Sequence, residues 1–252
     1  MQNYLYGKQP VLEFLKSAED DHGVEAVYVT DNLPSRIRDI LFSTVTRAKI
    51  KVLARKEIDR FLPEANHQGV VIRLIPGFSA RSKREANWKD FLKNHSGPMV
   101  ALDRIQDPQN LGSIIRSAEA LGATGVFITG KGSPLTAAAQ RTSAGAFLHI
   151  AAYQIPNINQ LIDEAKKEGF WIVSSIAEEI PEKNQTALST DDLSSLPEAE
   201  KILLIIGSEG EGIKASSVEK SDYLLTIPLR GKISSLNAGV AAGILLDRII
   251  NR

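Results

Sequence analysis

The sequence predicts an α/β protein: a parallel sheet covered by helices on both faces, preceded by a second, smaller α/β domain. Apolar runs of strand length recur along the chain, and helix-period segments lie between most of them. A polar stretch rich in Pro, Gly and Ser divides these runs into two series. The 252 residues are 43% hydrophobic and 24% charged, which is enough for one large or two small cores.

The first series predicts the small domain. A helix pattern, "QPVLEFLKSA", precedes a strand, "VEAVYVT". A helix around "SRIRDILFSTVTRA", a strand "IKVLA", a short helix "KEIDRFLP" and a strand "GVVIRLI" follow. This alternation is typical of an α/β layer domain, which we place at residues 1–75. The stretch "PGFSARSKRE" has the composition of a linker, and we place the linker at 76–96.

The second series, residues 97–252, predicts the parallel sheet. Its strand-length runs are "PMVALDRI", "GVFITG", "LHIAAYQI", "FWIVSSI", "KILLIIG" and "YLLTIPL". Helix patterns occupy 110–122, 135–146, 157–168, 211–220 and 235–250. Near-continuous apolar strands separated by helices indicate strands that are buried on both faces. In the last helix we expect a buried stripe of Leu236, Val240, Ile244 and Leu245, and we expect a surface excursion at 183–200.

Composition narrows the function classes. Cysteine is absent and the four histidines are scattered, so disulfides and cysteine chemistry are excluded and a metal enzyme is not expected. No apolar run approaches the roughly 18 residues of a membrane span, and the first twenty residues lack a signal-peptide pattern. We therefore expect a cytoplasmic protein with no membrane partner.

Charge is distributed unevenly although the net charge is zero. Residues 1–97 carry 16 Lys and Arg against 12 Asp and Glu, whereas residues 98–252 carry 14 against 18. Each basic cluster on its own is compatible with ordinary solvated surface. Their common location makes the N-terminal half the better candidate for contacting a polyanion.

Two phosphate-binding motifs nearly fit. The stretch "GVFITGKGS" lacks the final hydroxyl residue of a GxxxxGK[ST] loop, and "VFIT" has the pattern of a buried strand. The stretch "GSEGEG" follows a strand as a dinucleotide loop does, but its glycine order differs and it carries two glutamates that would repel a pyrophosphate. A nucleotidase and an NAD-dependent dehydrogenase are therefore disfavoured.

Three polar clusters remain: "DRIQDPQNLGSIIRSAEALGA", "GSEGEG" and "IPLRGKISSLNAGVAAG". Asn110 in the first is compatible with a helix N-cap and Arg116 with a surface cation. Arg116 nevertheless lies among apolar residues, so we expect its helix face to be half-buried and its guanidinium to have a partner. Each cluster follows an apolar strand, and open α/β sheets bind ligands at the carboxyl ends of their strands. Together the clusters indicate one site.

At these residues the chain resembles the SpoU (TrmH-type) RNA ribose 2′-O-methyltransferases of the SPOUT superfamily. The segments "NLGSIIRSA", "IIGSEGEGI" and "IPLRGKISSLNAGVAAGI" look like the three ordered motifs of that family, and the likeness covers 98–252. The N-terminal segments "YGKQPVLEFL" and "HQGVVIRL" are similar to the small substrate-binding domain of the ribosomal-RNA branch.

The resemblance implies a C-terminal deep trefoil knot, a homodimer and S-adenosylmethionine as cofactor. It implies 2′-O-methylation of a ribose, most simply of a guanosine in large-subunit ribosomal RNA. A transfer-RNA guanosine, a ribosomal adenosine and a non-catalytic ribosome-assembly role are the alternatives. The cofactor-binding residues it implies are Gly207, Glu209, Gly212, Ile227, Leu229 and Leu236, and the catalytic residues are Asn110, Arg116, Glu209, Ser235 and Asn237.

The resemblance gives Arg116 the task of activating the ribose hydroxyl. Two interpretations stay open: a base with an unusual guanidinium, or a cation that stabilises the developing alkoxide and binds a phosphate. We favour the cation, because guanidinium groups stay protonated in proteins. Glu209 is expected to orient either Arg116 or Asn110.

Overall fold

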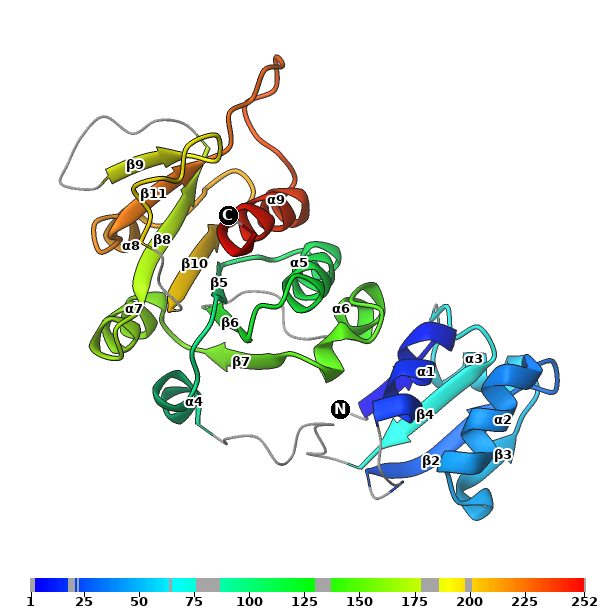
Figure 1. Ribbon diagram of the computed structural model, residues 1–252. Coiled ribbons are helices and arrows are strands. Elements are labelled where there is room, and N and C mark those ends of the chain that lie inside the picture. The colour runs from blue at the N-terminus through cyan, green and yellow to red at the C-terminus, as the bar shows by residue number, and fades with distance from the viewer. Residues whose placement is uncertain are drawn as a thin grey trace.

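The computed structural model describes residues 3–17, 21, 23–63, 65–75, 87–129, 137–177, 186–197 and 201–251. These residues form a four-stranded sheet from the N-terminal part of the chain and a seven-stranded sheet from the rest (Figure 1). The predicted division into two series of elements is thus seen as two separate sheets.

The smaller sheet has the strand order β1-β4-β2-β3, and its strands are β1 (Asn3–Tyr6), β2 (Val24–Val29), β3 (Ile50–Val52) and β4 (Val70–Leu74). Strands β2 and β3 are parallel, while β4 is antiparallel to both β1 and β2. Helices α1 (Lys8–Ser17) and α2 (Ser35–Thr44) bury their apolar sides on one face, η1 (Arg47–Lys49) leads into β3, and α3 (Arg55–Phe61) contributes to the core of the other face. Strand β1 was not predicted; its four residues are paired with β4 at the edge of the sheet.

The larger sheet is parallel throughout, as predicted. Its order is β7-β6-β5-β10-β8-β11-β9, and every neighbouring pair is parallel. The strands are β5 (Met99–Asp103), β6 (Gly125–Thr129), β7 (Ala151–Ile155), β8 (Trp171–Ile176), β9 (Thr186–Ser189), β10 (Ile202–Gly207) and β11 (Tyr223–Thr226). The predicted surface excursion at 183–200 is wrong in part, because β9 extends the sheet by pairing with β11.

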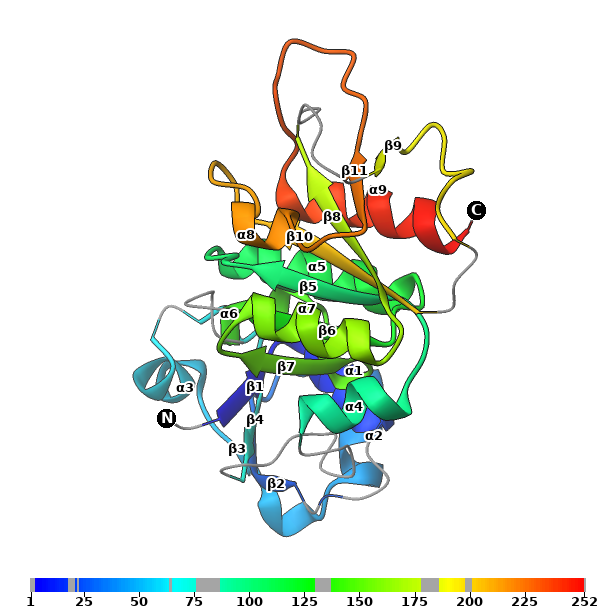
Figure 2. The same ribbon diagram turned by 90° about the vertical axis from the view of Figure 1, so that its left-hand side faces the viewer.

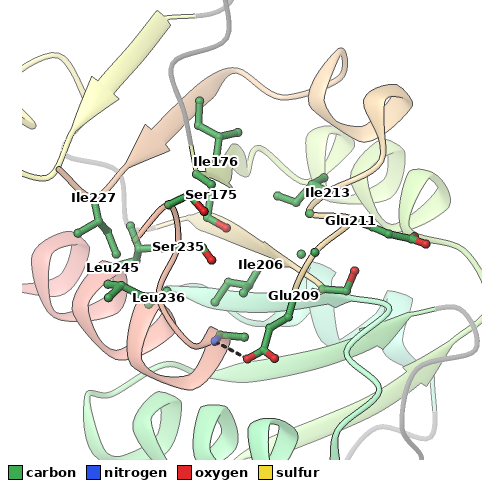
Figure 3. Close-up of a pocket in the computed structure, with 18 of the residues that line it drawn as sticks. Ser175, Ile176, Ile206, Glu209, Glu211, Ile213, Ile227, Ser235, Leu236 and Leu245 are labelled. Atoms are coloured by element: carbon green, nitrogen blue, oxygen red, sulfur yellow. Dashed lines mark hydrogen bonds between the residues drawn. The ribbon is translucent and has the colours of Figure 1, made fainter. Parts of the chain in front are cut away.

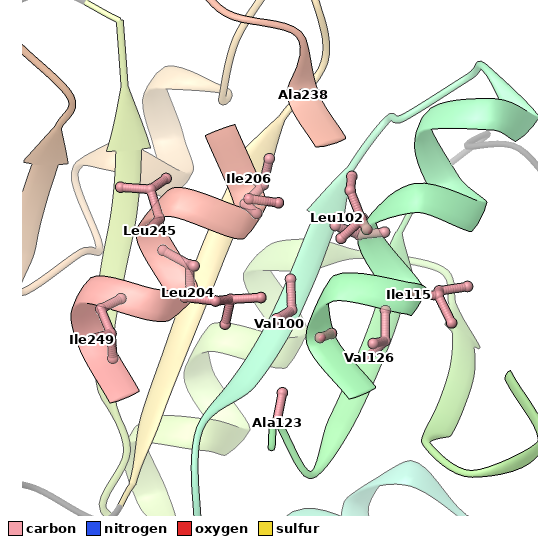
Figure 4. Packing of buried hydrophobic residues seen from close by; sticks show 14 of the residues in the cluster. Val100, Leu102, Ile115, Ala123, Val126, Leu204, Ile206, Ala238, Leu245 and Ile249 are labelled. Carbon is pink, nitrogen blue, oxygen red and sulfur yellow. The ribbon is translucent and has the colours of Figure 1, made fainter. Parts of the chain in front are cut away.

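Helices cover both faces of this sheet. One face packs on α5 (Pro108–Ala120), α6 (Ala137–Thr142) and α9 (Ala238–Ile250). Figure 4 shows apolar side chains of α5 and α9 next to those of the strands. The other face packs on α4 (Trp88–Asn94) and α7 (Ile158–Lys167), next to the short α8 (Ala215–Val218). Helix α8 is shorter than the predicted 211–220, because the residues before it belong to a loop.

Helix α9 buries only part of the predicted stripe: Leu245 is buried, Ile244 is partly buried, and Leu236 is partly buried but lies before the helix. Val240 is 52% exposed and Leu245 is 1% exposed, and the buried residues are Ala238, Gly239, Ala242, Leu245, Leu246 and Ile249. Small residues face α5 because the two helices lie very close together: a Cβ on Gly239 would lie 2.5 Å from Ser113 Oγ. The prediction assumed that large apolar side chains are the buried ones, whereas the close contact between α9 and α5 requires small side chains.

The two sheets are joined by more than the connecting chain. Leu148 in η2 (Ala146–Leu148) is buried in the N-terminal core with residues of α1. Nearby, Gly145 has a φ of +94°, and a Cβ there would lie 2.7 Å from Glu13 Cβ. Of the predicted linker, 76–86 lie outside the described residues and α4 occupies 88–94. Among the described residues, no helix combines the length and apolar character needed to cross a bilayer.

Candidate active site

A pocket of about 480 Å³ opens at the carboxyl ends of β8, β10 and β11. Figure 3 shows its walls, and Figure 2 shows the segment between β11 and α9 extending beyond the sheet. Loop 207–213, loop 227–236 and the start of α9 enclose the pocket, together with the end of β8. The second and third polar clusters predicted from the sequence line this pocket.

All six residues predicted to bind a cofactor line this pocket: Gly207, Glu209, Gly212, Ile227, Leu229 and Leu236. The close packing of the loop explains the glycine at 207, because a Cβ there would lie 2.3 Å from the carbonyl carbon of Gly212. Gly212 N donates to Ser208 O at 3.0 Å, so the loop folds back tightly on itself. Their cofactor-binding role stays a prediction.

A hydrogen-bond network joins the three polar clusters beside the pocket. Asn110 Nδ2 and Asn237 Nδ2 both donate to Glu209 Oε1 at 2.9 Å, and Asn237 Nδ2 also donates to Asn110 Oδ1 at 2.7 Å. Ala238 N donates to the same carboxylate oxygen at 3.2 Å (Figure 3). Glu209 therefore places its negative charge at the N-terminus of α9, where the helix dipole favours it.

Local sequence explains the positions of the two asparagines. Asp107 is the N-cap of α5 and accepts from Gln109 N at 2.9 Å, and Pro108 occupies the first turn. Asn110 is consequently not a cap, and its 7% exposed side chain is held by Glu209 and Asn237 instead. Asn237 is the N-cap of α9, and its Oδ1 accepts from Gly239 N at 3.0 Å.

The remaining predicted catalytic residues lie outside the network. Ser235 is exposed and lines the pocket. Arg116 is exposed on α5, so the expected half-buried environment is wrong: Ile114 and Ile115 point into the core, whereas Arg116 points to solvent. Its guanidinium makes no hydrogen bond or ion pair within the described part of the chain. Of the two partners expected for Glu209, the structure shows Asn110.

Sequence reasoning missed two residues at the end of β5. Arg104 forms an ion pair with Glu211, and its Nη2 donates to Gly212 O at 3.2 Å. Asp103 is 1% exposed, and its Oδ2 accepts from Lys214 N at 3.2 Å. Arg104 has a φ of +60°, which costs a residue with a side chain on the order of 1–2 kcal/mol. An Asp-Arg pair at the end of a buried strand was the available signal.

The end of β8 was missed as well. Ser175, Ile176 and Ala177 line the pocket between the two loops. Strand β8 lies between β10 and β11 in the sheet, which places its end beneath both loops. The strand was predicted, but its neighbours in the sheet were not, so nothing linked its last residues to the site.

Comparison with protein families identifies both parts of the chain. Residues 97–247 match the family described as SpoU rRNA Methylase. The chain belongs to this family. Residues 4–76 match a second family, described as RNA 2′-O ribose methyltransferase substrate binding. The SpoU protein is accordingly an RNA methyltransferase, and the predicted resemblance is confirmed.

Curated relatives of this SpoU protein have similar descriptions. A putative TrmH family tRNA/rRNA methyltransferase of Bacillus subtilis, YacO, is 30% identical over 99% of the chain and 96% of the relative. The 23S rRNA (guanosine-2′-O-)-methyltransferase RlmB of Vibrio vulnificus is 29% identical over the same shares. An uncharacterized tRNA/rRNA methyltransferase of Synechocystis is 33% identical over 98% of the chain, which spans 62% of that longer relative.

Solved structures confirm the fold. The AdoMet-bound rRNA methyltransferase of Sinorhizobium meliloti superposes with a TM-score of 0.74 at 21% identity, covering 98% of this chain and 86% of the other. The SpoU methyltransferase AviRb of Streptomyces viridochromogenes, in complex with AdoMet, gives 0.75 at 23% identity, with 99% and 90% covered. The trefoil knot stays a prediction.

Proposed function

We propose that the protein transfers a methyl group from S-adenosylmethionine (AdoMet) to the 2′-hydroxyl of a guanosine in large-subunit ribosomal RNA. The observation that carries the proposal is the pocket at the strand ends, with the Asn110–Glu209–Asn237 network beside it. Both features lie in the part of the chain that matches the SpoU rRNA methylases. A cytoplasmic location is part of the same proposal.

The pocket fits AdoMet in size and in chemistry. Its volume lies within the roughly 300–1,000 Å³ of small-molecule sites. Ile206, Ile227, Leu236 and Leu245 form apolar walls for an adenine ring, and Ser175 and Ser235 add polar groups. Gly207 leaves backbone where a side chain would intrude. When bound there, AdoMet supplies an activated methyl group.

The protein side chains have separate roles around the cofactor. The network of Asn110, Glu209 and Asn237 fixes the first turns of α5 and α9 relative to the pocket, so that both loops keep one geometry. Arg116 projects into solvent with no partner among the described residues, which leaves its charge available to an incoming phosphate or to the oxyanion of the ribose. Ser235 presents a hydroxyl to the pocket.

RNA binding is proposed for a domain at 1–75, joined through a linker at 76–96 to the catalytic domain at 97–252. The basic excess of the N-terminal half supports this, because phosphate contacts supply most of the affinity for RNA. Exposed cations extend over α2, β3 and α3: Arg36, Lys51, Arg55, Lys56 and Arg60. The acidic catalytic half is expected to bind RNA weakly by itself.

A homodimer and a trefoil knot belong to the same proposal. Ile233 and Val240 are 65% and 52% exposed, and they lie on the loop and helix that enclose the pocket. Exposed apolar residues of this kind mark a surface for association, and a second copy with two-fold symmetry would cover them. A particle of about 27.5 kDa by light scattering at micromolar concentration would contradict the dimer.

The test of the proposal is methyl transfer in vitro. The full-length protein is incubated with methyl-labelled AdoMet and, separately, with ribosomal RNA and transfer RNA, and the modified nucleotide is mapped. We expect label at the ribose of one guanosine of the large subunit. Label in transfer RNA alone, or on an adenosine, would overturn the substrate assignment, and AdoMet binding without transfer to any RNA would favour an assembly factor.

A further inference from the structure

Contacts hold loop 208–212 of the pocket on both sides of its tip, and we call these two sides its first and second limbs. At the first limb, Glu209 accepts hydrogen bonds from Asn110, Asn237 and Ala238. At the second limb, Arg104 contacts Glu211 and Gly212. Between the two limbs lies Gly210, which has a φ of +90° and where an added Cβ would meet no described atom within 4 Å. Contacts at the two limbs, rather than packing at the tip, therefore hold the shape of the loop.

The contacts at the second limb are made by the guanidinium of Arg104. Arg104 Nη1 pairs with the Glu211 carboxylate, and Nη2 donates to Gly212 O at 3.2 Å. Only 22% of the Arg104 side chain is exposed, whereas 75% of the Glu211 side chain is exposed. The planar fork of an arginine can bond a carboxylate and a carbonyl at once, which a lysine ammonium matches poorly.

The backbone at Arg104 supports a specific role for its side chain. With a φ of +60°, this residue occupies the left-handed region that a glycine would enter freely. Strained backbone of this kind persists where surrounding contacts determine it, and it concentrates at functional sites. Here the side chain contacts Glu211 and Gly212 of the loop, and its Nε lies 3.4 Å from Oδ2 of the neighbouring Asp103, so these contacts together offset the strain.

We propose that Arg104 is a positioning residue that keeps loop 208–212 in the conformation that receives AdoMet. This inference rests on the function proposed above. Arg104 does not line the pocket, and it acts through Glu211 and Gly212, which do. Without it the second limb of the loop must be ordered at the moment of binding, which weakens affinity. Arg104 also compensates the charge of Glu211 at the mouth of a pocket that already holds Glu209.

The experiment compares Arg104→Gly and Arg104→Lys with the unmodified protein by calorimetric titration of AdoMet. Glycine removes the side chain that holds the second limb and adopts the positive φ without strain, so the fold is retained. We expect an AdoMet Kd about tenfold weaker for Arg104→Gly, with kcat at saturating AdoMet and RNA unchanged. Arg104→Lys recovers part of the affinity. Faster amide hydrogen exchange at Gly212, whose N–H bonds Ser208 O, is the signature of the released loop.

A matched control is available in the N-terminal domain. Arg38 Nη2 donates to Asp31 O at 2.8 Å and to Leu33 O at 3.3 Å, so it too holds a loop through carbonyl groups. Arg38→Gln should leave the AdoMet Kd unchanged. Unmodified affinity in Arg104→Gly, or a lower kcat with an unchanged Kd, would overturn the positioning role while leaving the proposed function intact. Failure of the unmodified protein to bind AdoMet would overturn both.

Discussion

Asn237 Nδ2 lies 2.7 Å from Asn110 Oδ1, although 127 positions separate the two residues in the sequence. Both amides also bond Glu209, so three segments that follow three different strands share one small network. Each polar cluster that stands out in the sequence contributes one member. Hydrogen bonds therefore link the three clusters to one another, and this structural link is independent of any role that they have in catalysis.

Asn237→Ala should destabilise the protein by more than the loss of a helix cap. A cap alone contributes about 1 kcal/mol, and Asn237 also makes two hydrogen bonds within the network. We expect a loss of about 2–3 kcal/mol in the free energy of unfolding, measured with urea. Asn157 is the matched control, because it caps α7 through Asn159 N at 2.8 Å. Equal losses for Asn157→Ala and Asn237→Ala would show that the network adds nothing.

Arg116→Ala should abolish methyl transfer while preserving the cofactor site. Removing one preorganised charge-stabilising donor typically lowers the rate on the order of 10²–10³-fold. Because Arg116 is exposed and outside the pocket lining, the AdoMet Kd and the thermal midpoint should not change. Single-turnover kinetics and titration calorimetry measure the two quantities. Near-normal turnover would remove Arg116 from the mechanism, and a parallel loss of AdoMet binding would make it a structural residue.

Gly207→Ala should destroy the pocket. The added methyl group would lie within 2.5 Å of backbone atoms of Gly212 and Ile213, which have no flexible end to move aside. We expect AdoMet affinity to fall by about tenfold or more, measured by equilibrium dialysis, together with a lower thermal midpoint. Gly231 in the other loop provides the control, since a Cβ there meets nothing described within 4 Å. A Gly207→Ala variant that binds like Gly231→Ala would contradict the tight loop.

Acid should weaken the N-terminal domain through Asp21. Hydrogen bonds from Thr46 and the ammonium of Lys49 hold the pKa of Asp21 well below its usual range. The folded-state pKa is depressed, so this stabilisation is complete above the unfolded value of about 4 and is lost as pH falls towards the folded value. Urea midpoints measured from pH 7 to pH 2 should decline less steeply in Asp21→Asn. Parallel curves for the two proteins would exclude Asp21 as a cause.

Local pattern was sufficient to predict most of the sheet and its helical cover. Runs such as "KILLIIG" are buried on both sides, and burial is what their continuous apolar character reflects. Strand β9 was not predicted, because a run of only four residues becomes a strand through its pairing with β11. Pairing of this kind is a tertiary effect that local propensity does not contain.

Side-chain roles were harder to predict than positions. The asparagines and Glu209 were singled out by their polarity after apolar strands, and the structure brings them together. Arg104 was passed over because its function depends on a contact with a loop 107 residues away. Arg116 was expected to be half-buried from its neighbours in sequence, yet the helix turns those neighbours inward and the arginine outward.

The network beside the pocket also constrains the order of events during folding. Its members are brought together across 99 and 127 positions of chain, so closing it carries a large loop entropy and follows the formation of local helices. Helical signal in a refolding experiment should therefore recover before AdoMet affinity does. Ligand affinity in this protein would then act as a reporter of completed tertiary assembly, distinguishing finished molecules from compact intermediates that already contain the same secondary structure.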